Sequence, residues 1–318
     1  MTSRIGRLPP AVGALAAGAV LAVVLLVPAP AGAAFPGRNG LIAWTHPTSL
    51  TTDAEIFVMT PNGRRIRQLS HNEQNDFFPA WSADGRWVAF ESASATDVDV
   101  WVMNLAGTVS QNISQMPGVA DRGPAWSPDG ERIAFWRQHF DGTSGIWRMN
   151  ADGSNQVRLT ADANIDSYPA WSPDGRWIAF VSERDGNPEL YVMPPEGSPE
   201  IRLTRTPMVA EGNPNWSPDG RKLAFDACYA ASFPCPGTAP NYEIFTVNVN
   251  GTGLRRLTNE PGIDFNPAWS PDGTEIVFRS DRTGFTHIWK MDADGTDETQ
   301  LTTVDFTGGV DPDWQPIP

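Results

Sequence analysis

The sequence predicts an all-β fold, a six-bladed β-propeller whose blades are four-stranded antiparallel sheets. One seven-residue motif returns along the chain at a nearly constant spacing, and each interval between copies holds four short strand-like segments. The composition agrees, because 29 Gly, 29 Pro and 13 Trp in 318 residues fit many short strands joined by turns.

The repeated motif is Pro-Ala-Trp-Ser-Pro-Asp-Gly, with small variations. Its tryptophans lie 45, 45, 45, 53 and 45 residues apart. The full copies, followed by one partial copy, are residues 79–85, 124–130, 169–175, 214–220, 267–273 and 312–314. A period near 45 residues is typical of a propeller blade.

Each period contains four predicted strands. The first carries Pro, which suits an inner edge beside a channel, and the Ser-x-Asp-Gly that follows suits a tight hairpin turn. The second and third strands are apolar on both faces, as in 87–90 and 100–103, which fits a sheet packed between two others. The fourth is a short polar strand, which suits an outer edge. It contains Arg158, Arg202, Arg256 and Gln300 in successive periods.

The two ends of the chain are expected to share one blade. The segment before the first full motif supplies only second, third and fourth strands, and residues 312–314 supply only a first strand. Residues 37–70 and 310–316 therefore complete a sixth blade and close the ring. We expect one propeller domain over residues 35–318, although the length alone suggests two domains.

Residues 1–34 have the order of a secretory signal peptide. Arg4 and Arg7 precede an apolar run over 11–27, and small residues follow it. We expect cleavage after Ala33 or Ala34, with retention as a membrane anchor as the alternative. The prediction is an exported monomer, periplasmic or extracellular, with no membrane span after signal removal.

The net charge bears on the kind of partner, and the cysteine content bears on disulfide formation. The formal net charge of −14 makes nucleic acid an unsuitable partner. The only two cysteines, Cys228 and Cys235, lie close together, and in an exported chain they predict a disulfide.

The motif Pro-Ala-Trp-Ser-Pro-Asp-Gly, followed by Ile-Ala-Phe, resembles the repeats of the TolB C-terminal β-propeller family. The resemblance covers residues 37–316, and related blades occur in the dipeptidyl peptidase and prolyl oligopeptidase families. Those peptidases add an α/β-hydrolase domain, whereas this sequence has no Gly-x-Ser-x-Gly motif. The resemblance implies a propeller without peptidase activity.

One acidic residue stands three positions before the Pro of each full motif. These residues are Asp76, Asp121, Asp166, Glu211 and Asp264. One interpretation is a ring of carboxylates at the channel mouth that holds Ca²⁺ or a basic partner. The other is a side-chain cap that each blade repeats for structural reasons.

The residues next to these acids differ from blade to blade, which is typical of a binding site; the alternative is that about half of them simply pack between blades. The candidate partner-binding residues are Phe77, Arg122, Tyr168 and Phe265, together with Tyr229 and Phe233 of the enlarged period. One step further along each first strand stand Phe78, Gly123, Tyr168, Asn213, Asn266 and Asp311. Aromatic residues and Arg are common anchors of protein interfaces.

The functional hypothesis is an exported, non-enzymatic binding or scaffold propeller. It would recognise a protein or peptide of the cell envelope through its loop face and channel mouth, without a resident cofactor apart from the Ca²⁺ considered above. The alternative is a metal-assisted lyase or hydrolase acting on a small or glycan substrate at the channel mouth.

Overall fold

The structure is a computed structural model that describes residues 36–48, 53–161, 165–207, 209–229, 241–303, 306 and 308–318. The regular structure of these residues consists of strands β1 to β24, without an α-helix. This part of the chain contains no helix with the length and apolar character needed to cross a membrane. The predicted signal peptide lies outside the described residues and stays a prediction.

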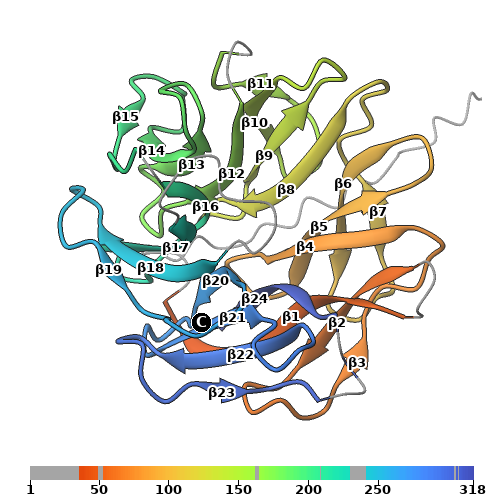
Figure 1. Cartoon of the computed structure of the whole chain (residues 1–318). Coiled ribbons are helices and arrows are strands. Elements are labelled where there is room, and N and C mark those ends of the chain that lie inside the picture. The colour runs from red at the N-terminus through yellow and green to blue at the C-terminus, as the bar shows by residue number, and fades with distance from the viewer. Residues whose placement is uncertain are drawn as a thin grey trace, which may run out of the picture. The chain divides into compact units, whose positions relative to one another are not determined.

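The strands form four-stranded antiparallel units placed around a central axis (Figure 1). One unit contains both ends of the described chain. From the axis outward, it consists of β24 (Val310–Ile317), β1 (Arg38–Pro47), β2 (Ala54–Met59) and β3 (Arg67–Gln68).

Two units belong to one eight-stranded sheet. The first is β4 (Asn75–Trp81), β5 (Trp87–Ala93), β6 (Val98–Asn104) and β7 (Ser110–Asn112). The second is β8 (Ala120–Trp126), β9 (Arg132–Gln138), β10 (Ser144–Asn150) and β11 (Val157–Arg158). A single parallel pair, Val98 with Ala120, connects them.

Three further sheets are separate and have four strands each. One is β12 (Asp166–Trp171), β13 (Ile178–Ser182), β14 (Glu189–Met193) and β15 (Ile201–Arg202). The next is β16 (Val209–Trp216), β17 (Lys222–Tyr229), β18 (Tyr242–Asn248) and β19 (Arg255–Arg256). The last is β20 (Asp264–Trp269), β21 (Glu275–Ser280), β22 (His287–Asp292) and β23 (Thr299–Gln300). The predicted all-β propeller arrangement of four-stranded antiparallel sheets is confirmed.

The repeated Ser-x-Asp-Gly segments form the hairpin turns expected of them. In the first copy, the hydroxyl of Ser82 donates to Asp84 at 2.6 Å and accepts from the backbone N–H of Trp87 at 3.0 Å. Gly85 has a φ of 67°, which a glycine adopts at little cost. The turn thus reverses the chain from β4 into β5.

Apolar clusters fill the space between neighbouring units. The repeated aromatic residue of each second strand is fully buried; these residues are Trp44, Phe90, Phe135, Phe180, Phe225 and Phe278. Between the last and the first unit, Ile42 and Met59 pack with Val277 and Leu301. Burial of both faces explains why the second and third strands lack alternating polar residues.

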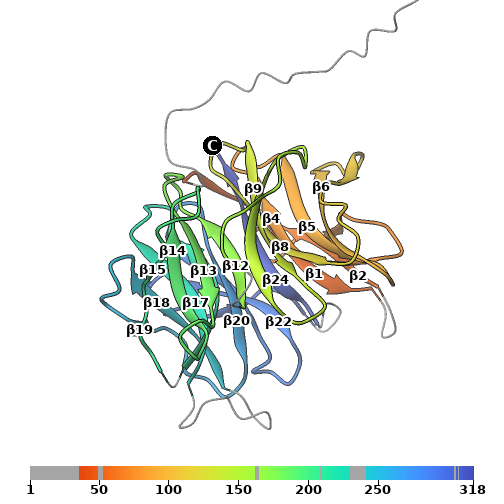
Figure 2. The ribbon, with the colours of Figure 1, turned by 90° about the horizontal axis from the view of Figure 1, so that it is seen from above.

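The two faces of the ring carry different connections. Because neighbouring strands are antiparallel, the short first-to-second and third-to-fourth turns share one face. The second-to-third loops and the connectors between units share the other, which is called the loop face below. Figure 2 shows the strands running from one face to the other, with the C-terminus at the upper face. The first strands of all units surround the axis.

Candidate functional site: the mouth of the central cavity

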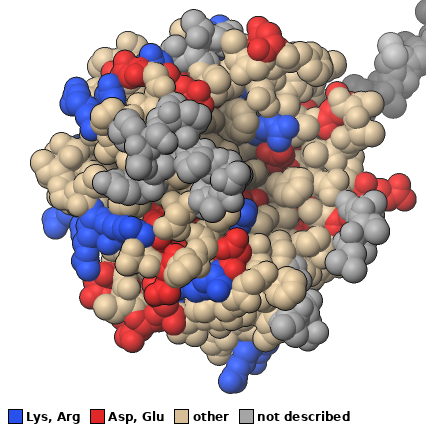
Figure 3. Space-filling view, in the orientation of Figure 1, with Lys and Arg blue, Asp and Glu red and all other residues tan. Residues whose placement is uncertain are grey.

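A cavity of about 190 Å³ lies on the axis of the ring. Its walls come from the first strands of all units, including the repeated Pro and Trp residues. Figure 3 shows a hollow in the middle of the ring, with acidic and basic side chains in and around it.

Six first-strand residues with a left-handed backbone form the mouth of this cavity. They are Phe78, Gly123, Tyr168, Asn213, Asn266 and Asp311, with φ between 46° and 54°, and all six line the cavity. In β4, a register shift between Phe77 and Ala80 marks a bulge at this point, and bulges change the direction of side chains. The backbone therefore repeats while the side chain changes from unit to unit.

The mouth has an aromatic side and a polar side. Phe78 and Tyr168 lie with ring centroids 6.1 Å apart. The polar residues Asn213, Asn266 and Asp311 come from three other units, on β16, β20 and β24. A surface that is partly aromatic and partly polar is suited to specific recognition rather than to simple packing.

A second layer at the mouth comes from the residue that follows the repeated aromatic of each second strand. These residues are Thr45, Glu91, Trp136, Val181, Asp226 and Arg279. Glu91 pairs with Phe77, Asp226 with Gly212, and Arg279 with Phe265 in the strand register. Sequence reasoning missed this layer. Its signal was present, because a charged residue next to a buried repeated Phe breaks an otherwise apolar pattern.

Carboxylates of this mouth bond to the neighbouring unit. Asp226 Oδ1 accepts the backbone N–H of Asn266 at 3.0 Å and the side-chain amide of Asn213 at 2.7 Å. Asp311 in the same way accepts the backbone N–H of Phe78. The bonds to Asn266 and Phe78 join two units, whereas the bond to Asn213 stays within one, and all three hold left-handed residues in place.

Glu91 and Arg122 form an ion pair at the mouth. Arg122 Nη1 donates to Glu91 Oε1 at 2.6 Å, and the guanidinium lies 5.7 Å from the Trp136 ring centroid. The backbone N–H of Gly123 also donates to Glu91. The predicted binding residue Arg122 is thus positioned by two side chains of the second layer.

Burial raises the pKa of the carboxyl groups here. The pKa of Asp311 rises to about 7 through burial, with Arg279 lowering it and Asp226 raising it further. Burial likewise raises the pKa of Glu91 to about 7 and that of Asp226 to about 6. The pKa of Tyr168 rises to about 12 through burial and then through the charges of Asp226, Asp311 and Glu91. Since one hydroxyl interacts with all three carboxylates, they surround the same region.

Several buried polar atoms of the mouth have no hydrogen-bond partner among the described residues. They are Glu91 Oε2, Asp226 Oδ2, Arg122 Nε and Arg279 Nε. Both carboxylates belong to side chains that are only 1% exposed. Unpaired buried polar groups are costly, and they are frequent at functional sites.

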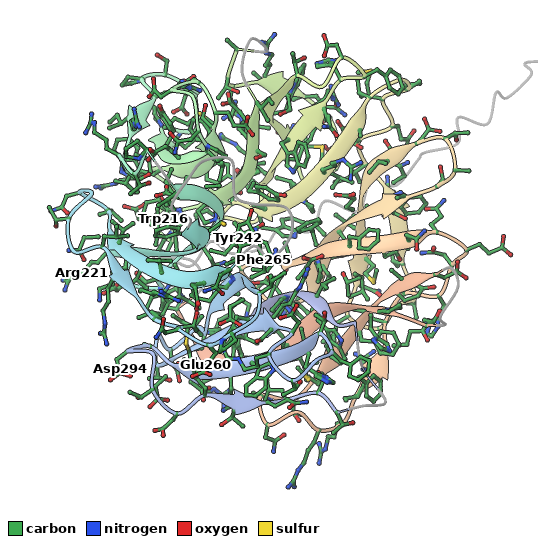
Figure 4. The ribbon with its side chains drawn as sticks, in the orientation of Figure 1. Trp216, Arg221, Tyr242, Glu260, Phe265 and Asp294 are labelled. Carbon is green, nitrogen blue, oxygen red and sulfur yellow. The ribbon has the colours of Figure 1, made fainter. Side chains whose placement is uncertain are left out.

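Phe265, another predicted binding residue, belongs to an aromatic pair. Its ring stacks on Tyr242 with centroids 4.2 Å apart, and Arg279 lies 5.2 Å from its centroid. Figure 4 shows Tyr242 and Phe265 next to each other near the middle of the ring. Phe77 lies one residue before Phe78 on β4, and its side chain is partly exposed. Of the predicted binding residues, Tyr168 thus lines the cavity, whereas Arg122 and Phe265 contact Glu91 and Arg279 of the second layer.

The predictions for the enlarged period stay open. Tyr229 ends β17, and Phe233 lies outside the described residues. Cys228 is buried within β17, whereas Cys235 lies outside the described residues. The disulfide between Cys228 and Cys235 stays a prediction.

The five acids considered as a metal ring each bond within their own sheet or to its connector, and Glu211 also accepts the backbone N–H of Leu190 in the preceding sheet at 3.0 Å. Asp121 makes a paired contact with Arg137, at 2.6 and 2.8 Å. Asp166 bonds Arg184, and Asp264 bonds Arg282.

The remaining two acids accept from uncharged groups. Asp76 accepts from Ser92 and Asn72. Glu211 accepts from Thr206 at 2.6 Å. Within the described part of the chain, no three His, Cys, Asp or Glu side chains gather as metal ligands. These contacts favour the structural interpretation over the Ca²⁺ ring.

Comparisons with known proteins agree with this architecture. The sequence matches the family described as the TolB beta propeller domain over residues 32–235 and 209–316. The chain belongs to the TolB β-propeller family. The Tol-Pal system protein TolB of Francisella tularensis subsp. mediasiatica is 28% identical to this TolB-family chain over 248 residues, which is 75% of this chain and 54% of the relative. The chain thus matches about half the length of that protein.

Solved structures show the same fold. A crystal structure of TolB from Acinetobacter baumannii superposes with a TM-score of 0.74 at 22% identity, covering 87% of this TolB-family chain and 67% of that one. An oligogalacturonate lyase in complex with manganese superposes with a TM-score of 0.57 at 13% identity, covering 80% of this chain and 72% of that one. At these identities the likeness concerns the fold alone.

Proposed function

We propose that this TolB-family chain is an exported, non-enzymatic binding propeller that recognises a protein or peptide of the cell envelope. The proposed ring has six blades, with the eight-stranded sheet counted as two, and is closed by the β24–β1 pair. Phe77, Arg122, Tyr168 and Phe265 bind the partner, together with Tyr229 and Phe233. The chain acts in the periplasm or outside the cell, as a monomer and without nucleic acid.

The main support for this proposal is the variation of side chains around the cavity mouth. Six positions share one backbone conformation but present different side chains, aromatic on Phe78 and Tyr168 and polar on Asn213, Asn266 and Asp311. Rigid scaffolds that vary residues near their loops commonly bind partners there. The relatives named TolB belong to a Tol-Pal system, which supports an envelope partner.

Affinity capture from envelope extracts tests the proposal. The purified chain is expected to retain a protein, and a variant with Tyr242→Ala and Phe265→Ala is expected to retain at least about tenfold less, because the aromatic pair supplies the anchor. Leu254→Ala is the control, since Leu254 is 49% exposed in the turn between β18 and β19, on the face opposite the loop face, and lies outside the cavity lining. Equal capture by both variants, or retention of small molecules only, would contradict the proposal.

A metal-assisted lyase or hydrolase is the second candidate. It is favoured by Glu91 and Asp311, whose pKa values near 7 suit general acid–base catalysis. Incubation with anionic oligosaccharides and Mn²⁺, followed by chromatography of the products, tests it. New products that disappear in Glu91→Gln and Asp311→Asn would establish this candidate in place of the first.

A further inference from the structure

The charge of the cavity wall is concentrated on one strand. Among the described residues that line the cavity, the only charged ones are Asp311 and Asp313, both on β24. At the corresponding two positions, the other first strands carry uncharged pairs. These are Phe78 and Ala80, Gly123 and Ala125, Tyr168 and Ala170, Asn213 and Asn215, and Asn266 and Ala268. A cavity with acids and no lining base attracts a cation.

The charges behind the wall do not neutralise these two acids. Glu91 and Asp226 add two carboxylates, each with one buried oxygen that lacks a partner among the described residues. Among the described residues, Arg122 acts on Glu91, and Arg279 acts on Asp226 and Asp311. When all of these groups are ionised, the four acids exceed the two bases by two negative charges. A cation in the cavity would relieve this excess.

We propose that the central cavity binds the side chain of a lysine presented by the partner peptide, with its ammonium group between Asp311 and Asp313. This inference rests on the proposed function, since it names the group by which the partner enters. The two residues are two positions apart on one strand, about 7 Å along it. An aliphatic stem of four methylenes therefore passes the mouth and carries its charge to the level of Asp313.

The hydrogen bonds of the two aspartates favour an ammonium over a guanidinium. Asp313 Oδ2 accepts the backbone N–H of Trp81 at 2.8 Å, and the backbone N–H of Trp314 also donates to this carboxylate. Asp311 accepts the backbone N–H of Phe78. At least one oxygen of each carboxylate is thus already engaged. Arginine binds best when both oxygens of a carboxylate are free, whereas an ammonium donates single bonds to several separate oxygens. The aromatic rings of Phe78 and Tyr168 add the cation–π attraction typical of ammonium sites.

Short capped peptides test this inference directly. The probe is acetyl-Gly-Gly-Lys-Gly-Gly-amide, compared with the same peptide carrying norleucine or arginine in place of lysine. Binding is followed by intrinsic fluorescence, because the tryptophans of the repeated motif line the cavity. The lysine peptide is expected to bind about tenfold more tightly than either of the others, as one charge-assisted contact predicts.

Variants locate the binding. Asp311→Asn and Asp313→Asn are each expected to weaken binding of the lysine peptide about tenfold, whereas Asp141→Asn, an exposed acid between β9 and β10, is expected to leave it unchanged. Equal affinity for the three peptides, or unchanged affinity in both cavity variants, would overturn the inference. The comparison of the three peptides uses only the unaltered chain, so it tests the lysine site even if a variant does not fold.

The two proposals fail separately. Envelope capture that survives Asp311→Asn and Asp313→Asn would sink the lysine site but leave the binding function. Binding of the lysine peptide without capture of any protein would contradict the binding function but leave the lysine site.

Discussion

At the residue scale, the acids of this propeller fall into two groups with different roles. Asp121 and its equivalents accept hydrogen bonds mainly from their own sheet or its connector, as in the contact between Asp121 and Arg137, with one bond from the preceding sheet to Glu211. Asp226, Asp311 and Asp313 instead bond to the next unit around the axis. Repetition along the sequence marks the structural group, and deviation from the repeat marks the group at the cavity.

Arg137→Met should destabilise the chain by roughly 3–5 kcal/mol, because it leaves the carboxylate of Asp121 buried without its partner. Urea unfolding measures the change. The double variant Arg137→Met with Asp121→Asn should recover part of the loss, since the unpaired charge is then absent. No recovery would show that packing of the arginine, rather than the ion pair, is what matters.

Asp313→Asn should stabilise the chain most above pH 7, less near pH 5 and little near pH 4. Burial raises the pKa of Asp313 to about 7 from its usual 3.8, so the folded chain holds this proton where the unfolded chain has lost it. The stability that this proton provides is present at low pH and is lost as the pH rises from about 4 to about 7. Asn215 shows that asparagine suits the position, because it accepts the backbone N–H of Trp269 at 3.0 Å.

Thermal unfolding of both proteins at pH 4 and pH 8 checks this expectation. A gain of roughly 1–3 kcal/mol at pH 8, with little at pH 4, is the predicted result. An equal effect at both pH values would mean that ionisation of Asp313 plays no part.

At the element scale, the turn between the third and fourth strands connects each unit to the one before it. Gly153 lies in such a turn, and a Cβ there would stand 2.1 Å from the carbonyl oxygen of Ile113 in the preceding unit. Gly63 makes the corresponding approach to Leu301, so the first and last units meet in the same way. The glycine is needed both for its backbone conformation and for this contact.

Gly153→Ala should therefore cost more stability than Gly130→Ala. Both glycines have positive φ, 85° and 70°, but a Cβ on Gly130 would meet no atom within 4 Å. Gly130→Ala should cost about 1 kcal/mol for the left-handed backbone alone. Gly153→Ala should exceed it by at least about 1–2 kcal/mol in chemical unfolding, since the neighbouring backbone must move. Equal costs would argue against a close approach between units.

Most of the strands and turns could be predicted from the sequence, whereas some features of the cavity mouth could not. The strands, the hairpin turns and the inner position of Pro-x-Trp were predictable, because each depends on local residue chemistry and on a repeat. The charged second layer at Glu91, Asp226 and Arg279 was not predicted, since it depends on the register between two strands. The left-handed backbone at Phe78 also depends on the bulge in β4, which side-chain type does not reveal.

At the scale of the whole molecule, the last strand, β24, belongs to the same sheet as the first strands, β1 to β3. Gln315 connects them: its Oε1 accepts the backbone N–H of Leu41 at 2.9 Å, and its Nε2 donates to the carbonyl of Gly85 at 2.7 Å. The side chain thus ties β24 to β1 and to the turn of the next unit.

Gln315→Ala should destabilise the chain by roughly 2 kcal/mol, because it leaves a backbone N–H and a carbonyl without their partner in a buried position. Gln300→Ala is the matched control, since the side-chain amide of Gln300 donates to the carbonyl of Thr302, two residues along its own chain segment. Differential scanning calorimetry compares the two. A Gln300→Ala effect as large as that of Gln315→Ala would show that the terminal contact has no special weight.

The pairing of β24 with β1 has a consequence for biosynthesis. Until residues 310–317 dock, the inner border of β1 offers its amide and carbonyl groups to any extended polypeptide nearby. A newly made chain whose β24 has not yet docked can exchange this strand with another copy of the chain. Docking of β24 joins residues more than 250 positions apart, and such a separation slows folding. Crowding of newly made copies would thus favour swapped dimers, until each tail settles in its own sheet.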